Sequence, residues 1–247
     1  MGTSTRLRCS HRPCLPGRNV RLAVTFPPMR TFLLSLSLCA TLAACASTSP
    51  PEPPAYEHRF EHAEQWAKEF DDPSRDSWQK PQLVIAAMQI APGMTVADIG
   101  AGTGYFEPHL SRAVGPNGRV LALDVEPDMV RYLRDRAARQ QLANVDARQV
   151  APDDPGLAAA SVDRVLIVDT WHHIANRAAY ASRLAAALRP GGEVIIVDFR
   201  RDAHRGPPPE HRIAPEEVAR ELSAGGLAAR VTEAGLPEQY LVVGTRR

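Results

Sequence analysis

Three glycines at alternate positions follow a short apolar run at residues 96–99, in the stretch VADIGAGTGYFEPHL. Gly100, Gly102 and Gly104 carry no Cβ atoms, so a ligand can approach the backbone closely at these positions. A strand is expected before this loop and a helix after it, which places the loop where open α/β sheets bind ligands. A phosphate and a nucleoside are both candidates for the ligand.

The residues around the glycines narrow this choice. A phosphate-binding Walker loop needs a Lys-Ser/Thr pair after its last glycine, and the chain has Tyr105-Phe106 there. A dinucleotide loop would place its third glycine at position 105, a departure of one residue that does not settle the question. Asp98 would repel a pyrophosphate but suits a ligand with an ammonium and a sulfonium. Asp124 ends the next apolar run, where a carboxylate can accept hydrogen bonds from ribose hydroxyls.

Several motifs occur in the order found in one known family. The stretch Asp98-Ile-Gly100-Ala-Gly102-Thr-Gly104 is similar to the first motif of the class I S-adenosylmethionine-dependent methyltransferases. The later stretches LANV (142–145), PDDPGLAAASVDRVLIVDTWHHI (152–174) and LRPGGEVIIVDF (188–199) extend the resemblance over about residues 78–247. The resemblance implies an α/β, doubly wound, seven-stranded Rossmann-like sheet, mostly parallel, with QYLVVGT as an antiparallel last strand.

The resemblance also implies site residues, with S-adenosylmethionine as co-substrate and no metal. The glycines would line the methionine part, Asp98 would hold its amino group, Asp124 the ribose and Asp154 the adenine side. Asp169, at the end of the fourth strand, would lie near the transferred methyl. The full set of implied cofactor-binding residues is Asp98, Gly100, Ala101, Gly102, Gly104, Asp124, Val125, Asp154 and Asp169.

Catalysis needs little from the protein, because the sulfonium is already an activated electrophile and alignment supplies much of the rate. A base is needed only if the acceptor arrives protonated. His172 and His173 follow the fourth strand, where either one is a candidate base or substrate-orienting group. The alternative is that one of them packs under the next helix.

The elements that position these residues alternate along the chain. Strands are expected at 95–100, 119–125, 144–150, 161–170 and 191–199, and helices at 106–115, 127–142, 176–188 and 215–224. Two short strand-like runs follow within residues 229–246. The strands are nearly continuous in Val, Ile and Leu, which indicates a mostly parallel sheet covered on both faces. This region, residues 93–247, is the expected cofactor-binding domain.

Residues 56–92 precede the sheet and are expected to be helical. Phe60, Trp66 and Phe70 share the three-and-four spacing of one helical face, which predicts a helix over 56–70. A second helix is expected at 81–90, with Leu83 and Val84 facing inward. The aromatic face is consistent with a ligand site or, more simply, with a core contact.

The amino-terminal residues have the pattern of an export signal. From Met29 the chain reads MRTFLLSLSLCATLAACASTSP, with a basic residue, a short apolar stretch and then small residues. LAAC at 42–45 resembles the bacterial lipobox and implies lipid modification of Cys45 after cleavage. We expect a leader at 1–28 that is not translated, a signal peptide at 29–44 and a proline-rich tether at 45–55. The protein would lie in the cell envelope, or in the cytoplasm if the signal is not used.

Composition limits the possible partners. The formal net charge is +1, which provides no basic field for nucleic acid. The four cysteines end at Cys45, so no cysteine-ligated metal site is expected in the domain. The expected partners are a small-molecule acceptor and, through the lipid, a membrane. An envelope-tethered binding or scaffold protein with the same fold but no catalysis remains the alternative, ahead of a NAD-type oxidoreductase.

Overall fold

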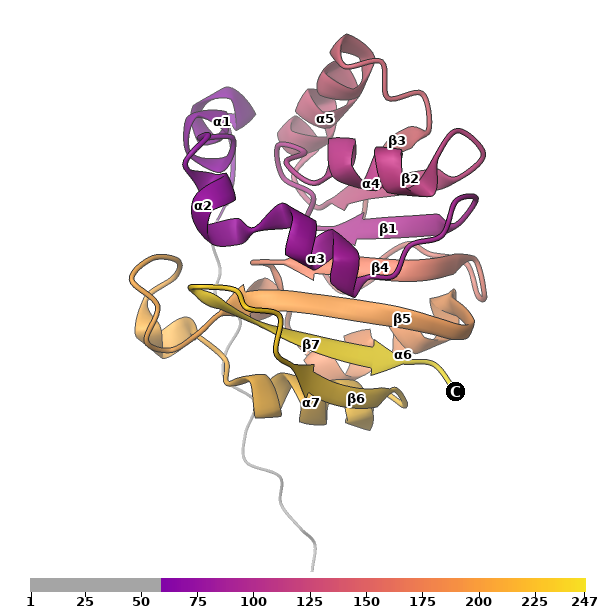
Figure 1. The fold of residues 1–247 in the computed structure, drawn as a ribbon, viewed down its shortest axis with the longest axis vertical. Helices are drawn as coiled ribbons and strands as arrows, with labels where there is room; N and C mark the ends of the chain where they lie inside the picture. The colour runs from indigo at the N-terminus through magenta and orange to yellow at the C-terminus, as the bar shows by residue number, and fades with distance from the viewer. Residues whose placement is uncertain (1–58) are drawn as a thin grey trace, which may run out of the picture. The chain divides into compact units, whose positions relative to one another are not determined.

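A computed structural model of the protein describes residues 59–247. The predictions for the leader, the signal peptide, Cys45 and the tether therefore lie outside the described residues. The described chain forms a seven-stranded sheet in the order β3-β2-β1-β4-β5-β7-β6 (Figure 1). Its strands are β1 (Thr95–Ile99), β2 (Arg119–Asp124), β3 (Val145–Gln149), β4 (Val162–Val168), β5 (Leu188–Phe199), β6 (Ala228–Thr232) and β7 (Gln239–Thr245).

The pairing of the strands confirms the predicted fold class. Strands β1 to β5 pair in parallel, whereas β7 lies antiparallel between β5 and β6. The parallel direction brings the carboxyl ends of β1, β2, β4 and β5 to one edge of the sheet. In an open α/β sheet, this is the edge at which ligands bind.

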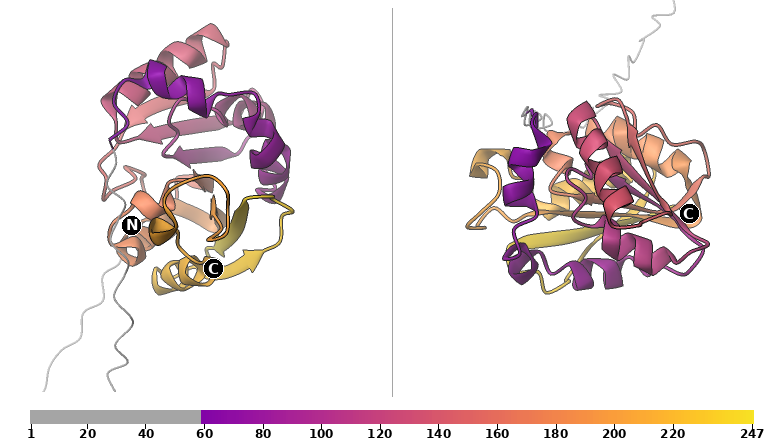
Figure 2. Two further views of the ribbon diagram at one scale, coloured as in Figure 1. Left: turned by 90° about the vertical axis from the view of Figure 1, so that its left-hand side faces the viewer. Right: turned by 90° about the horizontal axis from the view of Figure 1, so that it is seen from above.

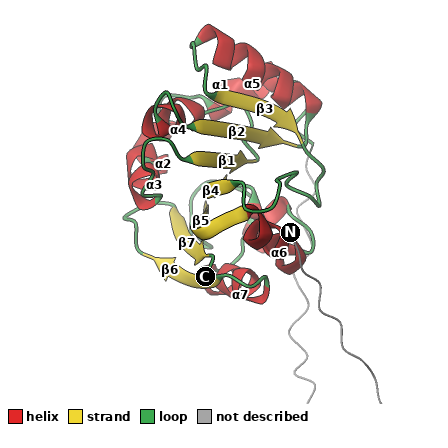
Figure 3. Cartoon of the chain, turned by 90° about the vertical axis from the view of Figure 1, so that its right-hand side faces the viewer, coloured by secondary structure: helices red, strands yellow, loops and turns green. Residues whose placement is uncertain are grey.

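Helices cover both faces of the sheet (Figure 3). One face packs against α3 (Pro81–Ala87), α4 (Glu107–Val114) and α5 (Pro127–Arg139), and the other against α6 (Arg177–Ala187) and α7 (Pro215–Ala224). Strand β1 shows the two-residue period: Val96 contributes to the first core and Ala97 to the second, and neither is exposed. The rigid sheet thus fixes the strand ends on which the site is built.

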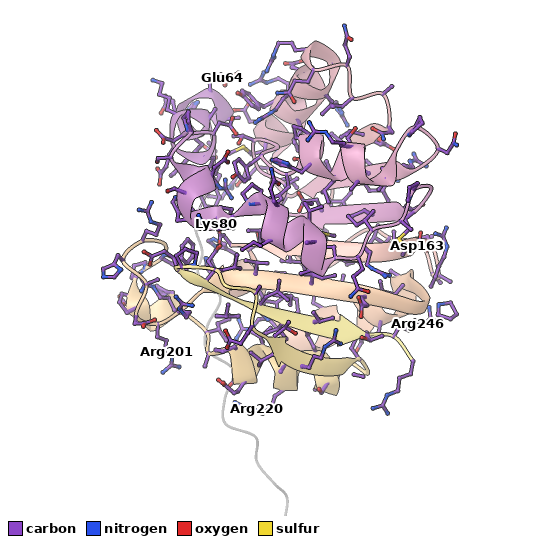
Figure 4. All side chains as sticks on the ribbon, in the orientation of Figure 1. Glu64, Lys80, Asp163, Arg201, Arg220 and Arg246 are labelled. Atoms are coloured by element: carbon purple, nitrogen blue, oxygen red, sulfur yellow. The ribbon has the colours of Figure 1, made fainter. Side chains whose placement is uncertain are left out.

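The residues before the sheet form two short helices, α1 (Ala63–Phe70) and α2 (Arg75–Gln79), here called the helical cap, followed by α3. The cap lies beside the carboxyl ends of the strands, and the left panel of Figure 2 looks onto this end. Lys80 joins α2 to α3 in the left-handed conformation, with a φ of 49° (Figure 4). Because this joint turns the chain sharply, α2 and α3 point in different directions.

Two details of this region differ from the expectations. Helix α1 begins at Ala63 rather than near residue 56, after His62 at a φ of 64°. The buried face of α3 is formed by Pro81 and Val84 and is continued by Met88 just after the helix, whereas Leu83 is 42% exposed. The prediction that Leu83 faces inward was therefore wrong, because it lies one residue off the i, i+3, i+7 row.

No helix within residues 59–247 is both long enough and apolar enough to span a bilayer.

Candidate functional site

A cavity of about 1040 Å³ lies at the carboxyl ends of β1, β2 and β4 and reaches Phe199 at the end of β5. The glycine loop after β1 forms its floor, and the helical cap contributes Phe70, Arg75 and Trp78. A cavity of this size takes a ligand as large as a nucleoside with a side chain. The expected site and the observed cavity therefore coincide in place.

The glycine loop is shaped by positive φ angles and a close contact. Gly100 has a φ of 74°, and a Cβ built there would lie 2.2 Å from the Oγ1 atom of Thr170. Gly100 and Gly102 line the cavity, as does Ala101 between them. Gly104 does not line the cavity: a Cβ on it would lie 2.9 Å from Leu133, so its lack of a side chain serves packing against α5.

Asp98 lies at the end of β1, on the cavity wall and 3% exposed. Burial raises its pKa to about 7, against the opposing effects of a hydrogen bond with Glu107 and of the Arg75 charge. Glu107, in the first turn of α4, is also buried, and its carboxyl can form a hydrogen bond with that of Asp98 when one of the two acids is protonated. Burial and the neighbouring Asp98 carboxyl raise the pKa of Glu107 well above its ordinary value. Asp98 on the cavity wall and Glu107 beside it, which does not line the cavity, thus form a pair of buried acids whose negative charge is poorly stabilised.

Asp124 ends β2, and its carboxylate is held by the backbone. One oxygen accepts a hydrogen bond from the N–H of Gly102 (2.8 Å) and the other from the N–H of Glu126 (2.9 Å). Burial raises the pKa of Asp124, while these two hydrogen bonds act in the opposite direction. The carboxylate is thus fixed in one orientation on the cavity wall. Each of its oxygens keeps a further lone pair that can accept a hydrogen bond from a ligand.

Asp169 follows β4 and lines the cavity in a strained backbone conformation, with a φ of 52°. Its Oδ1 atom accepts a hydrogen bond of 2.5 Å from the side chain of Gln239, whose oxygen in turn accepts one of 2.6 Å from Gln79. Both glutamines are buried, with exposures of 1% and 0%. This chain of amides connects β4 and β7 to α2 and holds the carboxyl in place.

The two histidines occupy different environments. His172 is buried, does not line the cavity, and has its Nδ1 atom 2.9 Å from both carboxyl oxygens of Asp198. Burial lowers its pKa, but the attraction of Asp198 outweighs this and the net shift is upward. His173 does line the cavity and packs edge-on against Phe60, with ring centroids 5.6 Å apart. The structure thus separates the pair: His173 faces the cavity, and His172 is turned into the core by Asp198.

Asp154 is not on the cavity wall, contrary to expectation. Residues 151 and 154 form an isolated bridge, and the Asp154 carboxylate accepts a hydrogen bond from the N–H of Gly156 (2.8 Å). This tight turn uses the carboxylate locally and leaves it exposed. At the end of β3 the wall is formed instead by residues 149–152, opposite Val125, which lines the cavity as expected.

Sequence reasoning missed several residues of the wall. Arg75 and Trp78 come from α2, whose five residues are too few to show a helical period. Glu126 lies two residues after β2, and Gln149 is the last residue of β3. Their positions at the ends of strands could have identified them in the sequence. Within the described residues, no group of three or more His, Cys, Asp or Glu side chains is placed to hold a metal ion.

Comparison with known proteins agrees with this geometry. Residues 96–192 match the model of a methyltransferase domain family. A crystal structure of a SAM-dependent methyltransferase from Aquifex aeolicus is 29% identical, with a TM-score of 0.71, and covers 76% of this chain and 100% of that chain.

Two curated relatives are similar over shorter lengths. The ubiquinone/menaquinone biosynthesis C-methyltransferase UbiE of Hydrogenovibrio crunogenus is 26% identical over 125 residues, 50% of this chain and 48% of that protein. The arsenite methyltransferase of Halobacterium salinarum is 32% identical over 119 residues, 48% of this chain and 30% of that protein. The chain thus spans half the length or less of these curated relatives. The chain is therefore similar in fold, and over residues 96–192 in sequence, to methyltransferases that include a SAM-dependent one.

Proposed function

We propose that the protein is an S-adenosylmethionine-dependent methyltransferase that acts on a small-molecule acceptor. The observation that supports this proposal most directly is the single cavity wall formed by Asp98, the Gly100–Gly102 backbone and Asp124, at the ends of two adjacent parallel strands. A nucleoside with a charged side chain needs these same features in this order: a carboxylate, a loop whose glycines let the ligand approach the backbone, and a second carboxylate.

The chemistry of the wall fits S-adenosylmethionine. Asp98, on the wall, is a buried acid whose pKa is raised, and an arriving ammonium or sulfonium would help to ionise it. Its buried neighbour Glu107 also has a raised pKa. Asp124 is oriented by two backbone N–H groups and presents acceptors for hydroxyl groups. Both observations concern the donor and acceptor character of the wall and are independent of sequence similarity.

S-adenosylmethionine supplies a methyl group that is already activated by its sulfonium. The residues of the chain then have to bind, orient and exclude water. Phe60 and Phe70 cover the cavity with apolar rings, and ring contacts of 5.8 Å between their centroids hold them together. Asp169 is held by Gln239 at the end of β4, and His173 faces the same space. The His173 side chain is placed to accept a proton from an acceptor that arrives protonated.

The acceptor side of the cavity favours a small molecule with an apolar body. Beyond the strand ends, the wall contains the rings of Phe60, Phe70, Trp78 and Phe199. Trp78 and Phe199 pack with centroids 5.8 Å apart. Aromatic walls of this kind bury planar or aliphatic groups and give few hydrogen bonds. The names of the curated relatives indicate different acceptors, so the acceptor of this chain has to be found by a screen.

We also propose that the protein is anchored in the bacterial envelope through lipid on Cys45, as its lipobox-like sequence suggests. Growth with labelled palmitate should label the wild type, and Cys45→Ser should abolish the label. Label that persists in Cys45→Ser would contradict the anchor without affecting the proposed chemistry.

The methyltransferase proposal is tested by calorimetry with the full chain. The wild type should bind S-adenosylmethionine, and Asp124→Ala should weaken that binding at least about tenfold, since hydrogen bonds to a charged group contribute about 1.5–3 kcal/mol. Asp154→Ala is the matched control, because that carboxylate does not reach the cavity, and its affinity should stay near the wild-type value. Absence of binding at millimolar S-adenosylmethionine would favour the scaffold alternative. If binding is observed, acceptors can be screened by formation of S-adenosylhomocysteine.

A further inference from the structure

Arg75 is a cation inside the cavity whose close partners are neutral. Only 14% of its side chain is exposed, and it lines the cavity from α2. Its Nε and Nη2 atoms donate to the side-chain oxygen of Gln79, at 3.2 and 3.0 Å, and its Nη1 atom donates to the backbone oxygen of Phe70 at 2.9 Å. A guanidinium has five N–H groups, so two of them remain for another acceptor.

A bound anion would stabilise the charge of the Arg75 guanidinium. Its nearest carboxylate oxygen in the described chain, on Asp169, is 3.8 Å away, which is too far for a hydrogen bond. Burial lowers the pKa of Arg75, so its charge is incompletely stabilised, although Asp169, Tyr105 and other groups oppose this shift. The guanidinium carbon also lies 4.1 Å from the centroid of the Tyr105 ring, which fixes its plane. Arg75 is therefore held in place by neutral groups with donors left over, as in a built anion site.

The position of Arg75 indicates which anion it would bind. Two carboxyls that line the cavity interact electrostatically with Arg75: Asp169, after the end of β4, and Asp98, at the end of β1, whose pKa the Arg75 charge lowers. One patch of the cavity therefore presents two carboxyls and one guanidinium, supplied by three different elements. An α-amino acid end presents the complementary pair, an ammonium and a carboxylate on one carbon atom.

We infer that Arg75 binds the carboxylate of the methionine end of S-adenosylmethionine, while Asp98 and Asp169 receive its ammonium. This inference rests on the proposed function and extends it, since α2 lies outside the matched segment 96–192. The cap is then part of the cofactor site as well as a cover over it. The buried hydrogen bond between Gln79 and Gln239 attaches the cap to β7. Because Arg75 donates to the side-chain oxygen of Gln79, this contact also fixes the position of Arg75.

The test compares two ligands that differ only in the carboxylate. S-adenosylmethionine and its decarboxylated analogue, which keeps the sulfonium and an ammonium, are titrated by calorimetry into the full chain. The wild type should bind S-adenosylmethionine about 10- to 100-fold more tightly than the analogue. Arg75→Gln should remove most of this preference by weakening S-adenosylmethionine alone, with a change of less than about threefold for the analogue. Arg205→Gln is the matched control: it removes the same charge from a residue that also lines the cavity but stacks on Trp78, at 5.0 Å. It should leave the preference intact.

Each outcome bears on the inference. If Arg75→Gln leaves the affinity for S-adenosylmethionine unchanged, Arg75 serves an anion of the acceptor instead and the inference is overturned. Equal weakening of both ligands would overturn it as well, because that result reports loss of the cap structure. If the wild type binds the two ligands with equal affinity, the inference is overturned without any variant. This comparison holds even if Arg75→Gln does not fold. If the wild type binds neither ligand, the proposed function itself fails and the inference with it.

Discussion

Gly100 is the position where the structure predicts the largest effect of adding one methyl group. Its φ of 74° disfavours any side chain, and an added Cβ would lie 2.2, 2.5 and 2.8 Å from three side-chain atoms of Thr170. The backbone contribution is about 1–2 kcal/mol, and overpacking contributes about 1–3 kcal/mol. Gly100→Ala should therefore lower the free energy of unfolding by about 2–5 kcal/mol.

Gly191 separates the two contributions. It has a φ of 73°, nearly that of Gly100, but nothing lies within 4 Å of a Cβ built on it. Gly191→Ala should therefore show the backbone contribution alone, about 1–2 kcal/mol. Urea unfolding of both variants, followed by circular dichroism, measures the difference between them, which is the contribution of the Thr170 contact.

A second variant makes the contact itself testable. Thr170→Ala removes the two atoms closest to the added methyl, so Gly100→Ala should cost less in the Thr170→Ala background. If Gly100→Ala and Gly191→Ala destabilise equally, or if Thr170→Ala gives no relief, the tight packing of the loop against β4 is refuted. Gly100→Ala should also weaken the binding of S-adenosylmethionine, because Thr170 lines the cavity and the added methyl would push its side chain into it.

Three further predictions follow from the charges of the site and core. Affinity for S-adenosylmethionine should rise from pH 6 to pH 8 in calorimetry, since burial raises the pKa of Asp98 and of Asp169 to about 7 and the ionised forms bind a cation; a flat profile would contradict this. For the ligand-free protein the sign is opposite: these pKa values lie above the ordinary 3.8, so their contribution to stability is present below about pH 4 and lost as pH rises to 7. The unfolding midpoint should fall over that window, and less so in Asp98→Asn. Glu221→Gln should cost about 3–5 kcal/mol in urea unfolding, because Arg177 is 1% exposed and its Nε atom lies 2.8 Å from that carboxylate; a cost below about 1 kcal/mol would contradict a buried pair.

Much of the fold was predictable because the chain alternates between two clear periods. Apolar runs such as 162–168 have the length of buried strands, and helices such as α5 begin with a proline in the first turn. The antiparallel last strand came from the resemblance to a family rather than from any period. Helix α2 was missed because five residues between two turns show neither period.

The cavity was predictable only where its residues directly follow strands. Asp98, Asp124 and Asp169 lie at the carboxyl ends of β1, β2 and β4, which are neighbours in the sheet, and topology alone brings such ends together. Arg75 comes from the cap, and no local pattern indicates that a surface-type residue there would be buried. Asp154 also lies near a strand end in sequence, but it does not line the cavity, because a tight turn uses its carboxylate.

The hydrogen bond between Gln79 and Gln239 joins residues 160 positions apart. Strand β7 is the last of the seven described strands to leave the ribosome, so the cap cannot make this contact until the whole sheet has been synthesised. Contacts of such long range form late in folding, after the local ones. The cavity would then be closed as one of the final folding steps, and a chain truncated before β7 would expose the aromatic rings of the cap instead of a finished site.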